Sequence, residues 1–189
     1  MERRKFMQQT MLAGAGILGS GSLLAETAAV KPNEKTAEKT FNLNYGFHQG
    51  MFEAHAGKDF LDQIKWAHEM GFRSIEDNGM MGRSVDEQKK IGDLLAKLGM
   101  TMGVFVVTSD SWHWKTSLTT GKQEWIDKMA KDCKTAVEVA KRCNAKHLTV
   151  VPGNYERSLS FEYQTANVIR ALKIGSAILE PHGLIMVLE

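Results

Sequence analysis

Residues 167–189 read NVIRALKIGSAILEPHGLIMVLE, and this stretch decides the fold class. Its first part has the apolar spacing of a helix, which we place over 162–180. The apolar residues expected on the inner face of this helix are Ile169, Leu172 and Leu179. Gly183 then favours a helix exit, because glycine readily adopts left-handed backbone angles. The apolar run 184–188 predicts a buried strand, so the stretch is typical of a parallel sheet with helical crossovers.

The same strand and helix unit recurs along the chain from residue 41. Four further apolar or aromatic runs predict strands, at 41–47, 72–76, 101–107 and 147–151. Gly71, Gly99 and Asn144 stand where helices would end and turn back towards the sheet. The chain therefore contains about four and a half units of an α/β fold.

Apolar stripes and a start signal place the helices between these strands. The stripes are Phe60, Ile64 and Ala67 in a helix over 59–70; Ile91, Leu94, Leu95 and Leu98 in a second helix; and Ile126, Ala130, Cys133, Val137 and Ala140 in a third. Ser84 with Glu87 three residues later predicts a capping box at the start of the second helix. Cys133 and Cys143 lie ten residues apart on the third helix, about 15 Å along its axis, so we expect two buried free thiols.

Two architectures fit this alternation: an open doubly wound sheet and a (β/α)8 barrel. The first strand ends in GFHQG (46–50), which is not the G-x-G-x-x-G fingerprint of dinucleotide binding. The barrel is therefore the better interpretation, but a whole barrel needs about 250 residues. Since the chain of 189 residues stops on the last residue of an apolar strand, we expect it to be the N-terminal part of a longer barrel.

Composition and charge exclude several classes of protein and one class of binding partner. The chain is 43% hydrophobic and 24% charged, a globular balance that excludes collagen-like and wholly disordered proteins. The net charge of +2 is matched by residues 1–25 alone, so the remainder is neutral. Because phosphate binding needs a cationic surface, we expect no nucleic-acid partner.

The N-terminus reads as an export signal. Residues 1–29 contain a basic start, an apolar stretch too short to span a bilayer, and small residues at the end. Arg3 and Arg4 indicate a twin-arginine signal and a periplasmic protein, with an ordinary secretory signal as the alternative. No cysteine lies near the expected cleavage site, so we expect no membrane anchor afterwards. Residues 30–40 are polar and predict a linker to a domain over 41–189.

Titratable side chains stand at the carboxyl ends of the predicted strands, where parallel α/β proteins gather their reactive groups. They are His48, Glu76, His113 and Glu189. Glu189 follows five apolar residues, and a carboxylate at a buried strand end favours a cation or hydrogen-bond donors. Glu76 has the alternatives of capping the next helix or pairing with Arg73 or Arg83. His113 lies between Trp112 and Trp114, which predicts a sugar pocket or, alternatively, an exposed loop. Structural roles are the default for His55, His68, Trp66 and Trp125.

Several segments together resemble a known family. GFRSIED (71–77), LGMTMGVF (98–105) and the closing stretch 167–189 are similar to the xylose-isomerase-like barrels, closest to hydroxypyruvate isomerase. The most specific features are Asn167 and Arg170 on a helix, followed by Pro181–His182–Gly183 and the strand that ends in Glu189.

The resemblance implies an isomerase or epimerase that moves a proton through an enediolate, with a small sugar or hydroxy-keto acid as substrate. It implies that Glu189 is both a ligand of Mg²⁺ or Mn²⁺ and a catalytic proton-transfer group, and that Glu76 faces the substrate. His48 and His113 remain substrate-binding candidates from their positions. The family takes its other metal ligands from later strands, so we expect this chain alone to be inactive.

Three rival hypotheses remain. The first is an exported, non-catalytic carbohydrate-binding protein with an aromatic pocket around Trp112 and Trp114. The second is a DNA-repair endonuclease of the same barrel superfamily, which the neutral charge and the export signal disfavour. The third is a truncated product without function. Because a half-barrel usually exposes two unpaired strand edges, we expect the fragment to have poor solubility or to self-associate.

Overall fold

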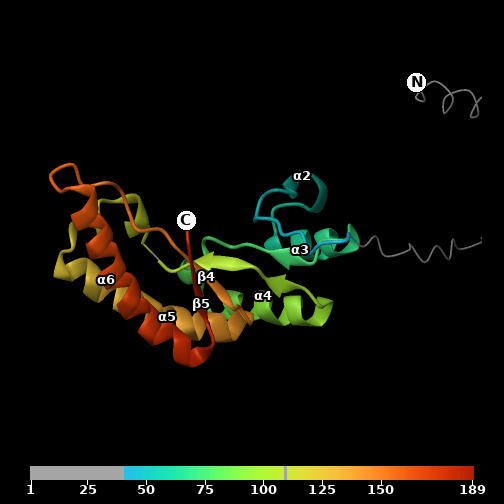
Figure 1. Cartoon of the computed structure of the whole chain (residues 1–189). Helices are drawn as coiled ribbons and strands as arrows, with labels where there is room; N and C mark the ends of the chain where they lie inside the picture. The colour runs from blue at the N-terminus through green and yellow to red at the C-terminus, as the bar shows by residue number, and fades with distance from the viewer. Residues whose placement is uncertain (1–40, 109) are drawn as a thin grey trace, which may run out of the picture. The chain divides into compact units, whose positions relative to one another are not determined.

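The structure is a computed structural model that describes residues 41–108 and 110–189 (Figure 1). The predicted signal over 1–29 and the linker over 30–40 lie outside the described residues. Helices and strands alternate as the sequence predicts. The α-helices are α2 (Glu53–Ala56), α3 (Phe60–Glu69), α4 (Val85–Leu98), α5 (Gln123–Cys143) and α6 (Phe161–Leu179), and the 3₁₀ turns are η1 (Met80–Gly82), η2 (Trp112–Trp114), η3 (Leu118–Thr120) and η4 (Glu180–His182). The strands are β1 (Ser74–Ile75), β2 (Thr101–Met102), β3 (Val104–Val106), β4 (His147–Val150) and β5 (Ile185–Leu188).

The strands are parallel and follow one another in chain order. β1 pairs with β2, while β3, β4 and β5 form a second group in that order. The predicted strand over 101–107 is thus divided at Gly103, whose N–H donates to the carbonyl of Ile75 at 2.8 Å. A Cβ at Gly103 would lie 3.1 Å from that carbonyl oxygen, so the glycine permits the close approach of the two segments.

The predicted strand over 41–47 is wrong as a regular strand. Only its last residue, Phe47, is buried, and the exposed residues before it give the segment little to pack against. The segment still runs beside β1, because Ser74 N–H donates to Tyr45 and Glu76 N–H donates to Phe47 at 3.1 and 2.9 Å. A single parallel bridge between His48 and Glu76 ends this contact.

The helices pack consecutively, α3 with α4, α4 with α5, and α5 with α6 (Figure 1). In a doubly wound sheet the helices divide between two faces, so this succession and the strand order both favour the barrel. The core between helices and strands is apolar. Its most deeply buried members include Ile64, Phe105, Met129, Cys133 and Leu148.

Most local predictions about the helices are confirmed. Gly71, Gly99, Asn144 and Gly183 all have positive φ at helix exits. Ser84 and Glu87 form the predicted capping box. Cys133 and Cys143 are buried and free.

The predicted inner face of α6 is wrong in one residue. Ile169 is 46% exposed, while Ala171, Gly175 and Leu179 are buried. The reason is a close approach of the helix, since a Cβ at Gly175 would lie 2.7 Å from the Met129 methyl group. Small residues therefore face the core, and the larger Ile169 lies beside it. Of the helices that the structure describes, none is long and apolar enough to cross a membrane.

Candidate active site

The carboxyl ends of the strands form one rim, because the strands are parallel. Five segments end at this rim, after Phe47, Ile75, Val106, Val150 and Leu188. The four predicted site residues therefore belong to a common edge of the molecule, as the sequence predicts.

His48 and Glu76 form a pair at the first two positions of the rim. His48 Nε2 lies 2.9 Å from Glu76 Oε2, and both side chains are nearly half exposed. Among the described residues, Glu76 neither caps a helix nor pairs with Arg73 or Arg83, so those alternatives are wrong. Arg73 instead donates to the carbonyls of His68 and Phe72. The pair presents a carboxylate and an imidazole to solvent at the strand ends.

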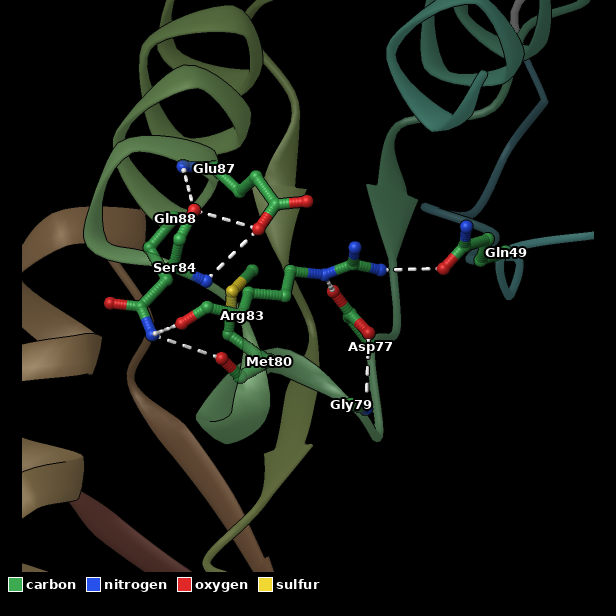
Figure 2. Close-up of polar contacts among 8 residues, drawn as sticks. All are labelled: Gln49, Asp77, Gly79, Met80, Arg83, Ser84, Glu87 and Gln88. Carbon is green, nitrogen blue, oxygen red and sulfur yellow. Dashed lines mark hydrogen bonds and ion pairs between the residues drawn. The ribbon is translucent and has the colours of Figure 1, made fainter. Parts of the chain in front are cut away.

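Asp77, next to Glu76, binds Arg83, which the sequence indicates only as a possible partner of Glu76. Its buried carboxylate accepts from Arg83 Nε at 2.5 Å and from Gly79 N–H at 3.1 Å. Arg83 Nη2 donates to Gln49 Oε1 at 2.6 Å, and the guanidinium lies 5.2 Å from the centre of the Phe60 ring. Figure 2 shows this arginine between the carboxylate and the amide. The contacts tie the start of α4 to the segment before α2.

The capping box holds the residues that follow Arg83. Ser84 Oγ accepts from Glu87 N–H at 3.2 Å, and the Glu87 carboxylate accepts from the Ser84 hydroxyl and N–H (Figure 2). Hydrogen bonds from Ser84 hold the pKa of Glu87 below its usual value. Buried Gln88 donates to the carbonyls of Met80 and Arg83, both at 3.0 Å. Side-chain hydrogen bonds thus hold the backbone on both sides of Arg83.

A polar pocket of about 480 Å³ opens between the loops after β1 and β3. Its lining is Gln49, Asn78, Gly79, Gly82, Arg83, Glu87, Thr108, Ser111 and His113. Amide, hydroxyl, imidazole and charged groups alternate there, so the pocket offers both donors and acceptors to a polyhydroxylated molecule.

His113 contributes the pocket's imidazole. Its Nδ1 is buried and has no hydrogen-bond partner among the residues that the structure describes. Burial lowers the pKa of the imidazole, against the opposing charges of Glu189 and Asp110. The ring is therefore neutral at pH 7 and has a ring nitrogen available within the protein.

The predicted aromatic pocket around His113 is wrong. Trp112 is 1% exposed and donates its indole N–H to Asp132 at 2.7 Å, so it is a core residue. Trp114 is 71% exposed, with its ring centre 5.0 Å from that of His113. The two tryptophans point to different environments and do not enclose a common space. Trp66 and Trp125 pack against the core, as expected.

Glu189 ends β5 and donates its backbone N–H to the Val150 carbonyl at 3.3 Å. Contrary to the expectation of a buried strand end, Glu189 is exposed, because β5 has a strand neighbour only on the β4 side within the described residues. Its charge nevertheless acts on His113. The rim thus brings His48 to Glu76, whereas Glu189 is not among the residues that line the pocket of His113.

A metal centre is incomplete in this part of the protein. Within residues 41–108 and 110–189, no three His, Cys, Asp or Glu side chains lie close enough together to hold an ion. Glu189 supplies one carboxylate of the kind that Mg²⁺ or Mn²⁺ prefers, and a full ligand cage needs more.

Comparisons with known proteins agree with this architecture. Residues 64–189, more than half of the chain, match the family model of the xylose isomerase-like TIM barrel. The chain therefore belongs to the xylose isomerase-like TIM barrel family, and its fold is part of a (β/α)8 barrel. No curated protein sequence shows a significant match.

Solved structures resemble the chain in fold at low identity. A sugar phosphate isomerase/epimerase from Parabacteroides distasonis superposes with a TM-score of 0.56 and 14% identity, covering 82% of this chain and 52% of its own. An AP endonuclease, family 2, from Brucella melitensis gives 0.61 and 16%, covering 77% and 55%. D-psicose 3-epimerase from Clostridium cellulolyticum gives 0.61 and 11%, covering 77% and 52%. The chain spans about half the length of these structures.

Proposed function

We propose that the complete protein is an isomerase or epimerase of a small sugar or hydroxy-keto acid, similar to hydroxypyruvate isomerase. The observation that carries the proposal is the placement of Glu189 at the end of β5, on the same rim of strand ends as the polar pocket that His113 lines. Family membership supports it, as do neighbouring structures described as isomerases and epimerases.

The chemistry suits these groups. A carboxylate such as Glu189 removes the weakly acidic proton from the hydroxyl-bearing carbon beside a carbonyl. The C–H electron pair forms the new C=C bond and the carbonyl π pair moves onto the oxygen, which gives an enediolate. For isomerisation, the hydroxyl proton also passes to the former carbonyl oxygen. Return of the proton to the neighbouring carbon moves the carbonyl, whereas return to the opposite face of the same carbon inverts it. Neutral His113 donates to the developing oxyanion.

A divalent ion, Mg²⁺ or Mn²⁺, is part of this proposal for the complete protein. When bound, such an ion stabilises negative charge on vicinal oxygens. Among the residues that the structure describes, Glu189 would hold it, and the other ligands are not supplied there. We therefore expect the 189-residue chain alone to turn over its substrate only at background rate.

Solvent deuterium exchange tests the function. The natural gene product is incubated in D₂O with hydroxypyruvate, ketohexoses and pentoses, with and without Mg²⁺ or Mn²⁺, and the proton beside the carbonyl is followed by ¹H NMR. We expect exchange with at least one substrate, and Glu189→Gln to slow it by about 100-fold or more, the usual contribution of a general base.

The matched control is Glu180→Gln, an exposed carboxylate in η4, which we expect to leave exchange unchanged. Absence of exchange with every substrate would exclude the proposed reaction. Full exchange in Glu189→Gln would instead remove this residue from it.

We also propose export to the periplasm by the twin-arginine route. The support is the sequence of residues 1–29 with Arg3 and Arg4. A fusion of this segment to a reporter should reach the periplasm, and the double change Arg3→Lys, Arg4→Lys should retain it in the cytoplasm. Export of the double variant through the general secretory route would show an ordinary signal. The proposal includes no nucleic-acid partner and no membrane anchor after cleavage.

A further inference from the structure

The loop that carries His113 is long, yet it is fastened on both sides of this residue. It runs from the end of β3 to the start of α5 and contains the two short turns η2 and η3. His113 is the middle residue of η2, so the direction of its imidazole depends on how Trp112 and Trp114 are held.

The first fastening is the buried side chain of Trp112. Its indole N–H donates to Asp132 Oδ2 on α5 at 2.7 Å, and Lys128 Nζ lies 3.4 Å from the same oxygen. Lys128 also lies 2.9 Å from Asp110 Oδ2, at the beginning of the loop. These contacts hold the main chain before His113 against α5.

The second fastening is Asn154, at the end of the fourth strand, where sequence reasoning finds no titratable group. Its side-chain amide donates to the Trp114 carbonyl at 2.6 Å, and its backbone N–H donates to the Lys115 carbonyl at 2.8 Å. Its own carbonyl accepts from the Thr119 hydroxyl at 2.7 Å. Asn154 thus uses three polar groups to hold the loop immediately after His113.

The chain before Asn154 is shaped for this contact. Gly153 has φ of +96°, and a Cβ there would lie 2.2 Å from Ser117 Oγ. A glycine at this position lets the fourth strand's end approach the loop closely. Helix α6 adds support from the far side, because Asn167 donates to the Thr119 carbonyl and Arg170 to the Gly121 carbonyl, both at 3.0 Å.

We infer that Asn154 is a positioning residue that sets the direction of the His113 imidazole in the pocket by clamping the carbonyl of Trp114. Glutamate, histidine and aspartate at the other strand ends present reactive groups, whereas the fourth strand presents the clamp. The inference rests on contacts within the chain, so it holds whether or not the proposed reaction is correct.

The test reads the histidine directly by NMR on the full chain. The ring centres of His113 and Trp114 lie 5.0 Å apart, and those of His55 and Trp66 also lie 5.0 Å apart, far from the clamp in sequence. Each pair should give cross-peaks between ring protons in the wild type. In Asn154→Ala we expect the His113–Trp114 cross-peaks to be lost and those of His55–Trp66 to remain.

Asn44→Ala, an exposed asparagine in the first segment, is the matched control and should keep both sets of cross-peaks. If Asn154→Ala does not fold, Asn154→Asp is measured in the same way, because it keeps the backbone bonds and the side-chain size and replaces the donor to Trp114 by an acceptor. Retention of the His113–Trp114 cross-peaks in a folded Asn154 variant, whatever its melting temperature, would overturn the inference.

Discussion

At the scale of single residues, neighbouring side chains in η2 differ strongly in burial. Trp112 fills the core and bonds a buried carboxylate, Trp114 is exposed, and His113 between them turns its Nδ1 into the protein. A turn of three residues can do this because its side chains point in different directions. The pocket's imidazole therefore depends on a tryptophan that never touches the pocket.

Trp112→Phe should destabilise the protein by about 2 kcal/mol, because it removes a hydrogen bond to the charged Asp132, for which about 1.5–3 kcal/mol is typical. Trp114→Phe is the matched control and should lie within about 0.5 kcal/mol of the wild type, as expected for an exposed position. Urea unfolding measures both. Equal effects of the two substitutions would contradict the assigned contacts.

The two thiols should resist alkylation at pH 8. Burial raises the pKa of Cys133 to about 12 and that of Cys143 to about 11, so little thiolate exists in the folded state. Iodoacetamide followed by mass spectrometry should show an unmodified native chain and two modifications in denaturant. Rapid labelling of the native chain would show that the thiols are accessible.

These thiols also give stability a pH dependence. In the unfolded chain they ionise near the ordinary value of 9.0, whereas the folded state keeps them neutral to higher pH. Their contribution is complete below pH 9 and is lost as the pH rises from there through 11 to 12. Substitution of both by alanine should flatten the decline of unfolding free energy in that window.

At the scale of elements, α4 and α6 differ in how they begin, and α4 also packs closely on α5. α4 begins with a complete capping box, while Ser160 at the start of α6 bonds no backbone N–H with its side chain. α4 also approaches α5 so closely that a Cβ at Gly92 would lie 2.0 Å from the Arg142 carbonyl oxygen. The position of α4, and with it of Arg83, is thus set by local capping and by one glycine.

Ser84→Ala should cost about 1 kcal/mol of stability, the typical value for a lost N-cap. Ser160→Ala should cost clearly less, because its hydroxyl caps nothing. Thermal or urea unfolding compares the two variants. A larger loss at Ser160 than at Ser84 would refute the assignment of the cap.

Features encoded over a few residues could be predicted from the sequence. The left-handed exits at Gly99 and Asn144 and the box of Ser84 and Glu87 depend only on local backbone chemistry, and the structure confirms them. The division of a strand at Gly103 was missed, because the close approach that permits it involves β1. Local sequence patterns thus predict the order of the helices and strands, but not how closely these elements approach one another.

The candidate site was predicted only in part for the same reason. Strand ends pointed to His48, Glu76, His113 and Glu189, since parallel strands share a rim. Arg83 was missed as a pocket residue because its partner Gln49 lies 34 residues away along the chain. The burial of Trp112 depends on α5, which no pattern within its own loop indicates.

At the scale of the whole molecule, β5 leaves an edge and an apolar face uncovered. It pairs only with β4 among the described strands, and Ile185 and Leu188 are more than half exposed. A groove of about 380 Å³ beside it is lined mainly by apolar residues, including Tyr155, Phe161, Leu172 and Leu188. Such an edge favours association with another chain.

The purified chain should therefore self-associate as its concentration rises, which light scattering measures. Leu188→Lys should reduce the association, because a charge at the edge opposes strand pairing. Val85→Lys, at an exposed valine on α4, is the matched control and should have no effect. A chain that stays monomeric at high concentration would contradict the expectation.

The chain-order succession of strands has a consequence for synthesis. β2 pairs with β1, β4 with β3 and β5 with β4, so each of these three strands pairs with one already made, and each long helix packs on its predecessor. As the polypeptide leaves the ribosome, a new strand and helix of this kind can therefore pack on elements that are already made. Assembly by vectorial growth, one unit at a time, is thus built into the topology.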